Sequence, residues 1–290
     1  MNGVVSTIRP APRGGELGEL LRGWRSARGR SQLDVSLDAN MSQRHLSFVE
    51  SGRSTPGRDK LLAIADALDI PLRERNALLL AAGYAPLYRD GSWDEPQMAG
   101  ITAAAARLLR QQEPYPAVLM DRHWNVLSAN AAAPRFFGLF IDMAERAGPR
   151  NILHLMFDPA GMRPFIRNWG VVAASLLGRV RREAVGGVLD PRSRELIEAL
   201  LAYPGAPVGR APLPSTTDLP MVPLSFERNG AVLSYFSMVC TVGTPTAVAA
   251  QELRVECMFP ADQATEDQHL ALMAPGTGHP WPEADEAPHP

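Results

Sequence analysis

The 290-residue chain is 46% hydrophobic, which is enough apolar material for two ordinary cores, and its net charge of −2 indicates no particular partner. No segment approaches the roughly 18 consecutive apolar residues of a membrane helix, and the first residues lack the apolar core of a signal peptide. Cys240 and Cys257 follow neither a metal-site spacing nor a disulfide framework. We therefore expect a cytoplasmic protein without membrane association.

The charges are distributed unevenly along the chain. Residues 1–60 contain ten Lys and Arg against six Asp and Glu, whereas no basic residue follows Arg254 and seven acidic residues lie between Glu256 and Glu286. A basic beginning and an acidic end indicate that the N-terminal part meets a polyanion. Random scatter of surface charge is the alternative interpretation.

The N-terminal region has helical periodicity from Glu16 to Gly83. In the first helix, the apolar residues follow the i, i+3, i+4, i+7 spacing of one helical face: Leu17, Leu20, Leu21 and Trp24. Ser31 is a suitable N-cap for a second helix over residues 32–39. Asn40 then tolerates the left-handed backbone of a tight turn, where Gly is commoner.

Three further short helices complete this region. The stretch "MSQRHLSFVESGRSTP" (41–56) predicts a third helix that Ser42 caps and Gly52 ends. Pro56 begins a fourth helix, and "LRERNALLLAAGYAP" (72–86) predicts a fifth that ends at Gly83. Five short helices in about 70 residues predict one all-α domain over residues 15–85.

The rest of the chain mixes strands and helices. Residues 86–100 predict a linker, and "ITAAAARLLRQQ" predicts a helix. Strand-like runs follow at 117–130, around a polar turn, and again as "VPLSFE", "AVLSYFSMVCTV" and "ELRVECMF". Between them lie helical residues 151–202 and a Pro-rich loop. Residues 101–274 therefore predict an α+β domain with a mixed antiparallel sheet. The two ends of the chain, residues 1–14 and the acidic tail 275–290, are expected to be disordered.

A scaffold helix, a tight turn and a second helix with a polar face form a helix-turn-helix arrangement, which inserts its second helix into the major groove of DNA. The segment "SQLDVSLDANMSQRHLSFVESGRSTP" (31–56) resembles the Cro/C1-type (XRE) helix-turn-helix family almost position by position. Ser36 replaces the usual inner Ala, and Asn40 replaces the usual turn Gly. The alternative is that the polar residues only solvate a surface helix.

The resemblance implies roles in DNA binding for individual residues. Gln43 and Arg44 lie where the family reads bases, and their side chains suit adenine and guanine. Gln32, Ser42 and Arg53 correspond to phosphate contacts. The full set of predicted DNA-binding residues is Gln32, Ser42, Gln43, Arg44, His45, Ser47, Phe48 and Arg53. Glu50 is expected to be structural, because a carboxylate near phosphate is repelled.

The second domain resembles the ligand-binding domain of MmyB-like transcription regulators, which has a PAS-like fold. The matching stretches are "YPAVLMDRHWNVLSANAAA" (115–133), "NILHLMFDP" (151–159), "GVLDPRSRELIEALLAYP" (187–204) and "VPLSFERNGAVLSYFSMVCTVGTPTAVAAQELRVECMFPADQATE" (222–266). The sequence departs from the family at 205–220, which is Pro-rich where many relatives carry a Trp-containing strand.

Helices packed over one face of a sheet can leave an apolar cavity between the layers. The resemblance implies that this cavity takes a fatty-acid-like or other small hydrophobic effector. The candidate lining residues are the large apolar side chains Trp124, Phe136, Phe137, Met156, Phe157, Phe165, Trp169, Tyr235 and Phe236. A filled core without a ligand is the alternative.

Catalytic and metal-binding motifs are not found in the sequence. His123, His154 and His269 lack an i, i+4 partner, and no phosphate-binding loop, nucleophile elbow or dinucleotide-binding glycine pattern occurs. We therefore expect neither an enzyme nor a cofactor.

Together these features predict a transcription regulator that binds a double-stranded operator as a homodimer, since one short helix reads only a few base pairs. Its second domain is expected to sense a hydrophobic small molecule. Two alternatives remain open: a second domain that only dimerises or contacts polymerase, and a helical domain that docks proteins without binding DNA.

Overall fold

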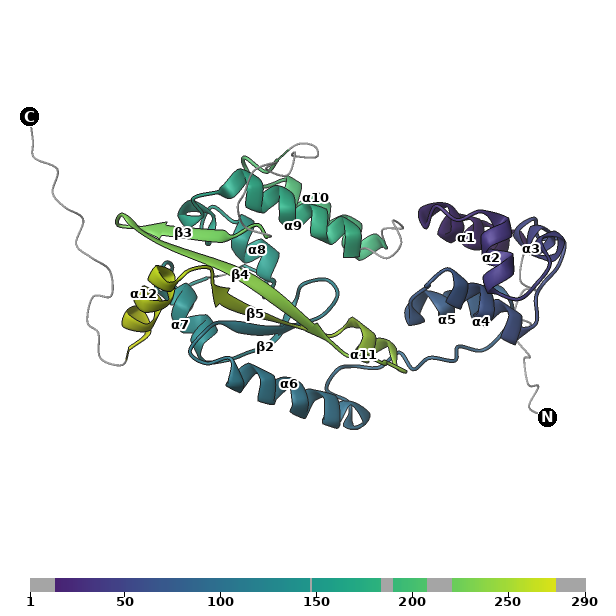
Figure 1. The fold of residues 1–290 in the computed structure, drawn as a ribbon, viewed down its shortest axis with the longest axis horizontal. Coiled ribbons are helices and arrows are strands. Elements are labelled where there is room, and N and C mark those ends of the chain that lie inside the picture. Colours follow the sequence, from purple (N-terminus) through teal and green to yellow (C-terminus); the bar gives the residue numbers. More distant parts are fainter. Residues whose placement is uncertain (1–13, 147, 184–189, 208–220, 275–290) are drawn as a thin grey trace, which may run out of the picture. The chain divides into compact units, whose positions relative to one another are not determined.

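The computed structural model describes residues 14–146, 148–183, 190–207 and 221–274 (Figure 1). Its described residues form two compact units: one holds the chain up to Gly91 together with Pro245–Gln251, and the other holds the rest. The expected mobile ends, 1–14 and 275–290, lie outside the described residues except for Gly14, where the first helix begins.

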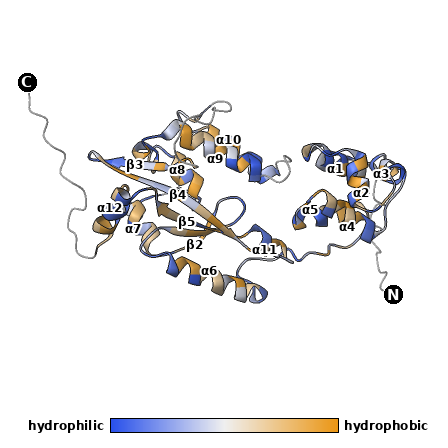
Figure 2. Cartoon of the chain, in the orientation of Figure 1, coloured by the Kyte–Doolittle hydropathy of each residue, from blue (hydrophilic) through white to orange (hydrophobic). Residues whose placement is uncertain are grey.

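The first unit contains the five predicted short helices. They are α1 (Gly14–Ala27), α2 (Gln32–Asp38), α3 (Gln43–Glu50), α4 (Arg58–Ala67) and α5 (Leu72–Ala81). The predicted apolar stripe of α1 is confirmed for Leu17, Leu21 and Trp24, which are buried, whereas Leu20 is exposed. Figure 2 shows the resulting alternation of hydrophobic and hydrophilic residues along each helix.

The turn between α2 and α3 has the backbone that the sequence predicts. Asn40 has a φ of 48°, and the N–H groups of Asn40 and Met41 donate to the carbonyls of Leu37 and Ser36, which ends α2 in a Schellman motif. Ser31 caps α2 through a capping box, and the hydroxyl of Ser42 accepts from His45 N–H at 3.2 Å. The two helices are therefore delimited by local hydrogen bonds.

A segment from the second half of the chain belongs to the first unit. Residues 245–251 include most of α11 (Val248–Glu252), and the Val248 N–H donates to the carbonyl of Arg89 at 3.0 Å. Leu72 N–H, at the start of α5, donates to the Gln251 side chain at 2.8 Å. Since the first N–H groups of a helix have no partner within it, Gln251 acts as a cap for α5.

The second unit is built on one five-stranded sheet with the order β2-β1-β5-β4-β3, and every pairing is antiparallel. The strands are β1 (Ala117–Met120), β2 (Val126–Ala129), β3 (Leu224–Arg228), β4 (Ala231–Thr241) and β5 (Arg254–Pro260). The expected all-α first domain and α+β second domain are thus both confirmed.

Helices cover both faces of this sheet (Figure 1). They are α6 (Ala99–Gln111), α7 (Ala132–Gly138), α8 (Ile152–Phe157), α9 (Trp169–Glu183), α10 (Pro191–Leu201) and α12 (Gln263–Met273), with 3-10 helices η1 (Pro96–Met98) and η2 (Arg163–Phe165). Helix α6 packs on β1 and β5. No helix among the described residues is long and apolar enough to span a membrane.

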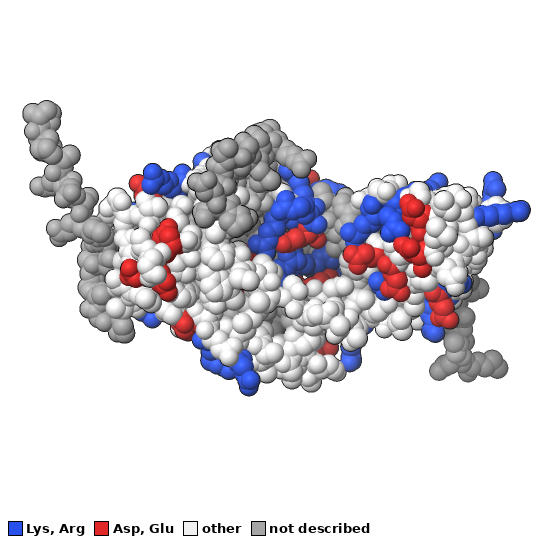
Figure 3. All heavy atoms as spheres, viewed as in Figure 1, with Lys and Arg blue, Asp and Glu red and all other residues white. Residues whose placement is uncertain are grey.

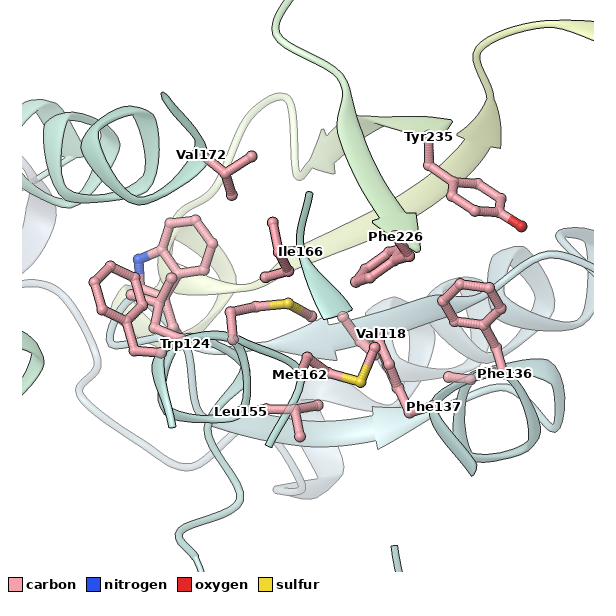
Figure 4. Packing of buried hydrophobic residues seen from close by; sticks show 14 of the residues in the cluster. Val118, Trp124, Phe136, Phe137, Leu155, Met162, Ile166, Val172, Phe226 and Tyr235 are labelled. Carbon is pink, nitrogen blue, oxygen red and sulfur yellow. The ribbon is translucent and has the colours of Figure 1, made fainter. Parts of the chain in front are cut away.

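The main core of the second unit lies between the sheet and helices α7 to α10 and α12. Successive side chains of a strand point to opposite faces, and Val118 and Met120 of β1 join this core. Figure 4 shows Phe136, Phe226 and Tyr235 gathered at one end of the cluster and Trp124 at the other. The Phe136 ring makes edge contacts with Phe226 and Tyr235 at centroid distances of 5.5 and 5.2 Å.

We predict that Gly18→Ala destabilises the first unit. A Cβ at Gly18 would lie 2.3 Å from the backbone carbonyl oxygen of Glu50, so α1 and α3 would have to separate, at a cost of about 1–3 kcal/mol. On the same helix, a Cβ at Gly23 meets nothing within 4 Å, and Gly23→Ala should instead stabilise the helix by up to about 1 kcal/mol. Urea unfolding of both variants measures the difference, and equal effects would contradict the close approach.

We predict that the second unit loses stability as pH falls below the ordinary histidine pKa. The fully buried His269 ring bonds the Tyr235 hydroxyl at 2.7 Å and the Pro114 carbonyl at 3.0 Å, and burial lowers its pKa more than the carbonyl hydrogen bond raises it. The unfolded chain therefore takes up a proton first, and stability present above about pH 6.5 is lost below it.

His269→Gln should weaken this dependence without abolishing it, because burial also lowers the pKa of His154. Urea midpoints measured from about pH 7.5 to about pH 5.5 provide the comparison. An unchanged pH dependence in His269→Gln would show that this histidine is not responsible.

Candidate DNA-binding interface and ligand cavity

Helix α3 presents its N-terminal end to solvent. Ser42, Gln43 and Arg44 are exposed, whereas Leu46 and Val49 are buried against the rest of the unit. The predicted secondary contacts, His45, Ser47 and Phe48, are half-buried on the same helix. A helix that reads the major groove needs exposed side chains that can hydrogen-bond to base edges, and an opposite apolar face that packs on its own domain.

Phe48 lies between two predicted DNA contacts. The guanidinium carbon of Arg44 is 5.3 Å from the centre of the Phe48 ring, and that of Arg53 is 5.9 Å from it. The Arg53 N–H also donates to the Phe48 carbonyl at 2.8 Å, so the chain after Gly52 turns back onto α3. The aromatic ring thus holds two cations close to each other on α3 and the loop that follows it.

Glu50 ties α3 to the two preceding helices. It is 3% exposed, and its carboxylate accepts hydrogen bonds from Arg25 Nε at 2.7 Å and Arg25 Nη2 at 2.9 Å, a paired contact that raises the pKa of Arg25. Gln32 Nε2 donates to the second carboxylate oxygen at 2.8 Å. Glu50 is therefore structural, as expected, and Gln32, the predicted phosphate contact, already uses one amide hydrogen inside the protein.

Basic and acidic side chains lie side by side on the face of the first unit seen in Figure 3. Several form ion pairs, including Arg30 with Asp38 at 2.5 Å and Arg28 with Asp69 at 3.6 Å. Within the part of the chain that the structure describes, Arg44 and Arg53 form no ion pair. Their charge is therefore available to an external anion.

The second unit contains a cavity of about 160 Å³ between the sheet and helices α8 and α9. Its walls are mainly apolar and come from β1, the turn that follows it, α7, α8, α9, β3, β4, β5 and the residues just before β1 and β3. The lining side chains are Pro116, Ala117, Val118, Trp124, Phe137, Ile152, Leu153, Met156, Val172, Ser175, Leu176, Arg179, Val222, Leu224, Tyr235, Phe236, Ser237, Glu256 and Met258. A cavity of this size holds a ligand about as large as benzene.

The cavity brings together five of the nine predicted lining residues: Trp124, Phe137, Met156, Tyr235 and Phe236. The other four do not line it. Phe136 and Phe157 are fully buried in the core, and Phe165 packs on Phe140. Trp169 instead packs its ring on Phe157 at 4.9 Å and donates its indole N–H to the Gly205 carbonyl.

Two charged residues of the cavity were missed by the search for apolar side chains. Arg179 completes an i, i+3, i+4, i+7 series on α9 with Val172, Ser175 and Leu176, so an Arg on an otherwise largely apolar stripe was the available signal. Glu256 lies two residues before Met258 on β5, so both side chains point to the same face of the sheet. Alternation along β5 makes the opposite face the more apolar one in the sequence, so periodicity gave no signal for Glu256.

Comparisons with known proteins agree with both units. Residues 101–272 match the model of the MmyB-like transcription regulator ligand binding domain, and residues 16–78 match a helix-turn-helix domain. The chain is also 40% identical over 67 residues to the transcriptional regulator ClgR of two Mycobacterium tuberculosis strains, CDC 1551 / Oshkosh and H37Rv. That region covers 23% of this chain and 57% of ClgR, a little over half of the relative's length.

These features define a helix-turn-helix transcription regulator with a separate ligand-binding domain. The match over residues 101–272 covers more than half of the chain, and the protein belongs to the MmyB-like transcription regulators.

We predict that Glu50→Ala costs about 2–4 kcal/mol of stability, because it leaves Arg25 and Gln32 without their partner in a poorly solvated position. Asp38→Ala is the matched control: it removes an ion pair with Arg30 whose side chains are 34% and 52% exposed, and should cost less than about 1 kcal/mol. Thermal unfolding of the two variants makes the comparison, and similar losses would contradict the structural role of Glu50.

Proposed function

We propose that the protein binds a double-stranded operator through α3 and controls that binding through a fatty-acid-like or other small hydrophobic effector in the second unit. The observation that carries the DNA-binding half is the pair Arg44 and Arg53. Both lie beside the Phe48 ring of α3, without a carboxylate partner in the described structure, and Glu50 holds that helix in place.

In this proposal, Gln43 and Arg44 read base edges, because Gln suits adenine and Arg suits guanine through paired hydrogen bonds. Ser42 and Arg53 contact phosphates. Gln32 contacts a phosphate with the second hydrogen of the amide nitrogen that already donates to Glu50. His45, Ser47 and Phe48 supply secondary contacts, with Phe48 also fixing the two arginines.

A homodimer follows from the length of the reading helix. At 1.5 Å per residue, the eight residues of α3 span about 12 Å and reach only a few base pairs. Two copies on half-sites one helical turn apart supply the remaining affinity and specificity.

The cavity of the second unit supports the proposal that an effector controls DNA binding. Its apolar walls favour an apolar body, and each buried methylene contributes about 0.8 kcal/mol. An effector alters DNA binding if it prefers one conformation of the protein over another. A second domain that only dimerises, or contacts polymerase, needs no such ligand.

We predict that Arg44→Ala loses about 1–3 kcal/mol of binding to the operator and relaxes preference at one base pair. Arg53→Ala should weaken operator and random DNA alike. Arg107→Ala, which removes an exposed charge on α6, is the control and should leave binding unchanged. Fluorescence anisotropy with an operator selected from a random pool measures all three. Equal losses on both DNAs for Arg44→Ala would mean that Arg44 reads no base, and no binding to any duplex at low salt would end the proposal of operator binding.

We predict that straight-chain alcohols and amphiphiles raise the melting temperature of the full-length protein, because they bind the folded state alone. The shift should grow with chain length and stop once the cavity is filled. Leu176→Lys, which puts a charge on the cavity wall, should abolish the shift, whereas Leu201→Lys at an exposed site on α10 should retain it. If no amphiphile of any chain length or head group moves the melting curve, the second unit is not a sensor of this kind.

A further inference from the structure

The cavity has a polar end formed by two charged side chains from different elements. Arg179 of α9 and Glu256 of β5 both line it, and Arg179 Nη1 donates to Glu256 Oε1 at 3.0 Å. The Arg179 guanidinium also stacks on the Trp124 ring, with 4.4 Å between the guanidinium carbon and the ring centre. One part of a mainly apolar cavity, which also has Ser175 and Ser237 in its lining, is therefore fixed in position and strongly polar.

The charges at this end balance. Arg179 Nε donates to Glu183 Oε1 at 2.6 Å, and Glu183 is also paired with Arg254. We call Arg179, Glu183, Arg254 and Glu256 the Arg179 cluster. Burial lowers the pKa of Arg179, but the neighbouring Glu256 and Glu183 carboxylates more than offset this, so the guanidinium remains charged. Two arginines against two glutamates leave no net charge to attract an ionised ligand.

The hydrogen bonding of this cluster is incomplete at the cavity residues. Arg179 Nη2 and Glu256 Oε2 are shut off from solvent and have no hydrogen-bond partner within the described protein. Nearly all buried polar atoms in native proteins are hydrogen-bonded, and leaving one unsatisfied costs about 1–3 kcal/mol. One of these atoms is a donor and the other is an acceptor. They belong to two side chains already joined by a hydrogen bond, so a single small group can meet both.

We propose, resting on the effector function proposed above, that the cavity selects a compact amphiphile with an uncharged head that both accepts a hydrogen bond and donates one. The head accepts from Arg179 and donates to Glu256. Primary carboxamides and alcohols have this chemistry. A carboxylate has no hydrogen to donate and repels Glu256, and an ammonium has no acceptor and repels Arg179. Either ion also adds an uncompensated charge in an apolar setting.

The volume of the cavity determines the chain length of suitable test ligands. Since a cavity of about this volume holds benzene, a six-carbon body is a suitable match. Hexanamide, hexan-1-ol, hexanoate and hexylamine share their chain length and differ in the head group. Isothermal titration calorimetry of the full-length protein at neutral pH compares them directly.

The amide should bind tightest and the alcohol next, with the two ions weaker by about tenfold or more, because each ion loses a hydrogen bond and gains a repulsion. Hexanoate binding as tightly as hexanamide would overturn the proposal while leaving the sensor function intact. No binding by any of the four, together with no melting shift from longer chains, would overturn both.

Glu256→Gln provides the decisive variant, because its amide donates where the carboxylate accepted. It should reverse the preference, so that hexanoate binds more tightly than hexanamide. Glu183→Gln is the matched control: it makes the same change in net charge on a residue outside the cavity lining, and the lost charge should narrow the preference for the amide without reversing it. Equal changes in the amide-to-carboxylate ratio in both variants would show that charge alone sets the selectivity, and would overturn the hydrogen-bonding proposal. If Glu256→Gln does not fold, the head-group series on the natural protein decides.

Discussion

The geometry of the first unit depends on one buried carboxylate. Glu50 ends α3, and its oxygens accept hydrogen bonds from Arg25 of α1 and Gln32 of α2, so three helices meet at one charge. A buried carboxylate is tolerated only where fixed donors replace water. Gly18 lets the backbones of α1 and α3 approach closely enough for this. The C-terminal end of α3 is thereby fixed, while its N-terminal end stays exposed.

Both units contain a poorly solvated Arg–Glu contact, but the hydrogen bonding of the contact is complete in the first unit and incomplete in the second. At Glu50 the Arg–Glu contact is complete, since both carboxylate oxygens have donors, and it serves stability. At Glu256 the contact leaves one carboxylate oxygen and one guanidinium nitrogen buried without partners. An Arg–Glu pair in which both carboxylate oxygens are already bonded has no free acceptor for a ligand. An incomplete pair at the end of an apolar cavity carries a cost that a complementary ligand removes.

Local signals explain why the helix-turn-helix region could be predicted in detail. Ser31, Asn40, Ser42 and Gly52 act within a few residues of their own positions, and their caps and turns appear where the sequence places them. The contact of Gln32 with Glu50 spans 18 residues and depends on how α2 packs on α3. Sequence spacing gave the position of Gln32, but could not reveal its partner.

The lining of the cavity was harder to predict, because the sequence offers many large apolar residues. Only the packing of the folded chain decides which of them line the cavity and which are buried in the core. Phe136 has the same character as Phe137, yet aromatic rings surround Phe136 on several sides while Phe137 borders the cavity. Searching for apolar side chains also overlooked Arg179 and Glu256. Arg179 lies on a largely apolar helical face and could have been found as an exception to it, whereas only the strand pairing shows that Glu256 faces the cavity.

The polar end of the cavity is close in sequence to the segment that joins the first unit. Arg254 of the Arg179 cluster begins β5, and Gln251, only three residues earlier, caps α5. In the proposed function, a ligand that completes the bonding of Arg179 and Glu256 favours the state in which this cluster, including the Arg254–Glu183 pair, is formed. It thereby fixes the start of β5, from which α11 leads back to Gln251. None of the residues 251–254 belongs to the aromatic core around Phe136, so the proposed coupling needs no rearrangement of that core.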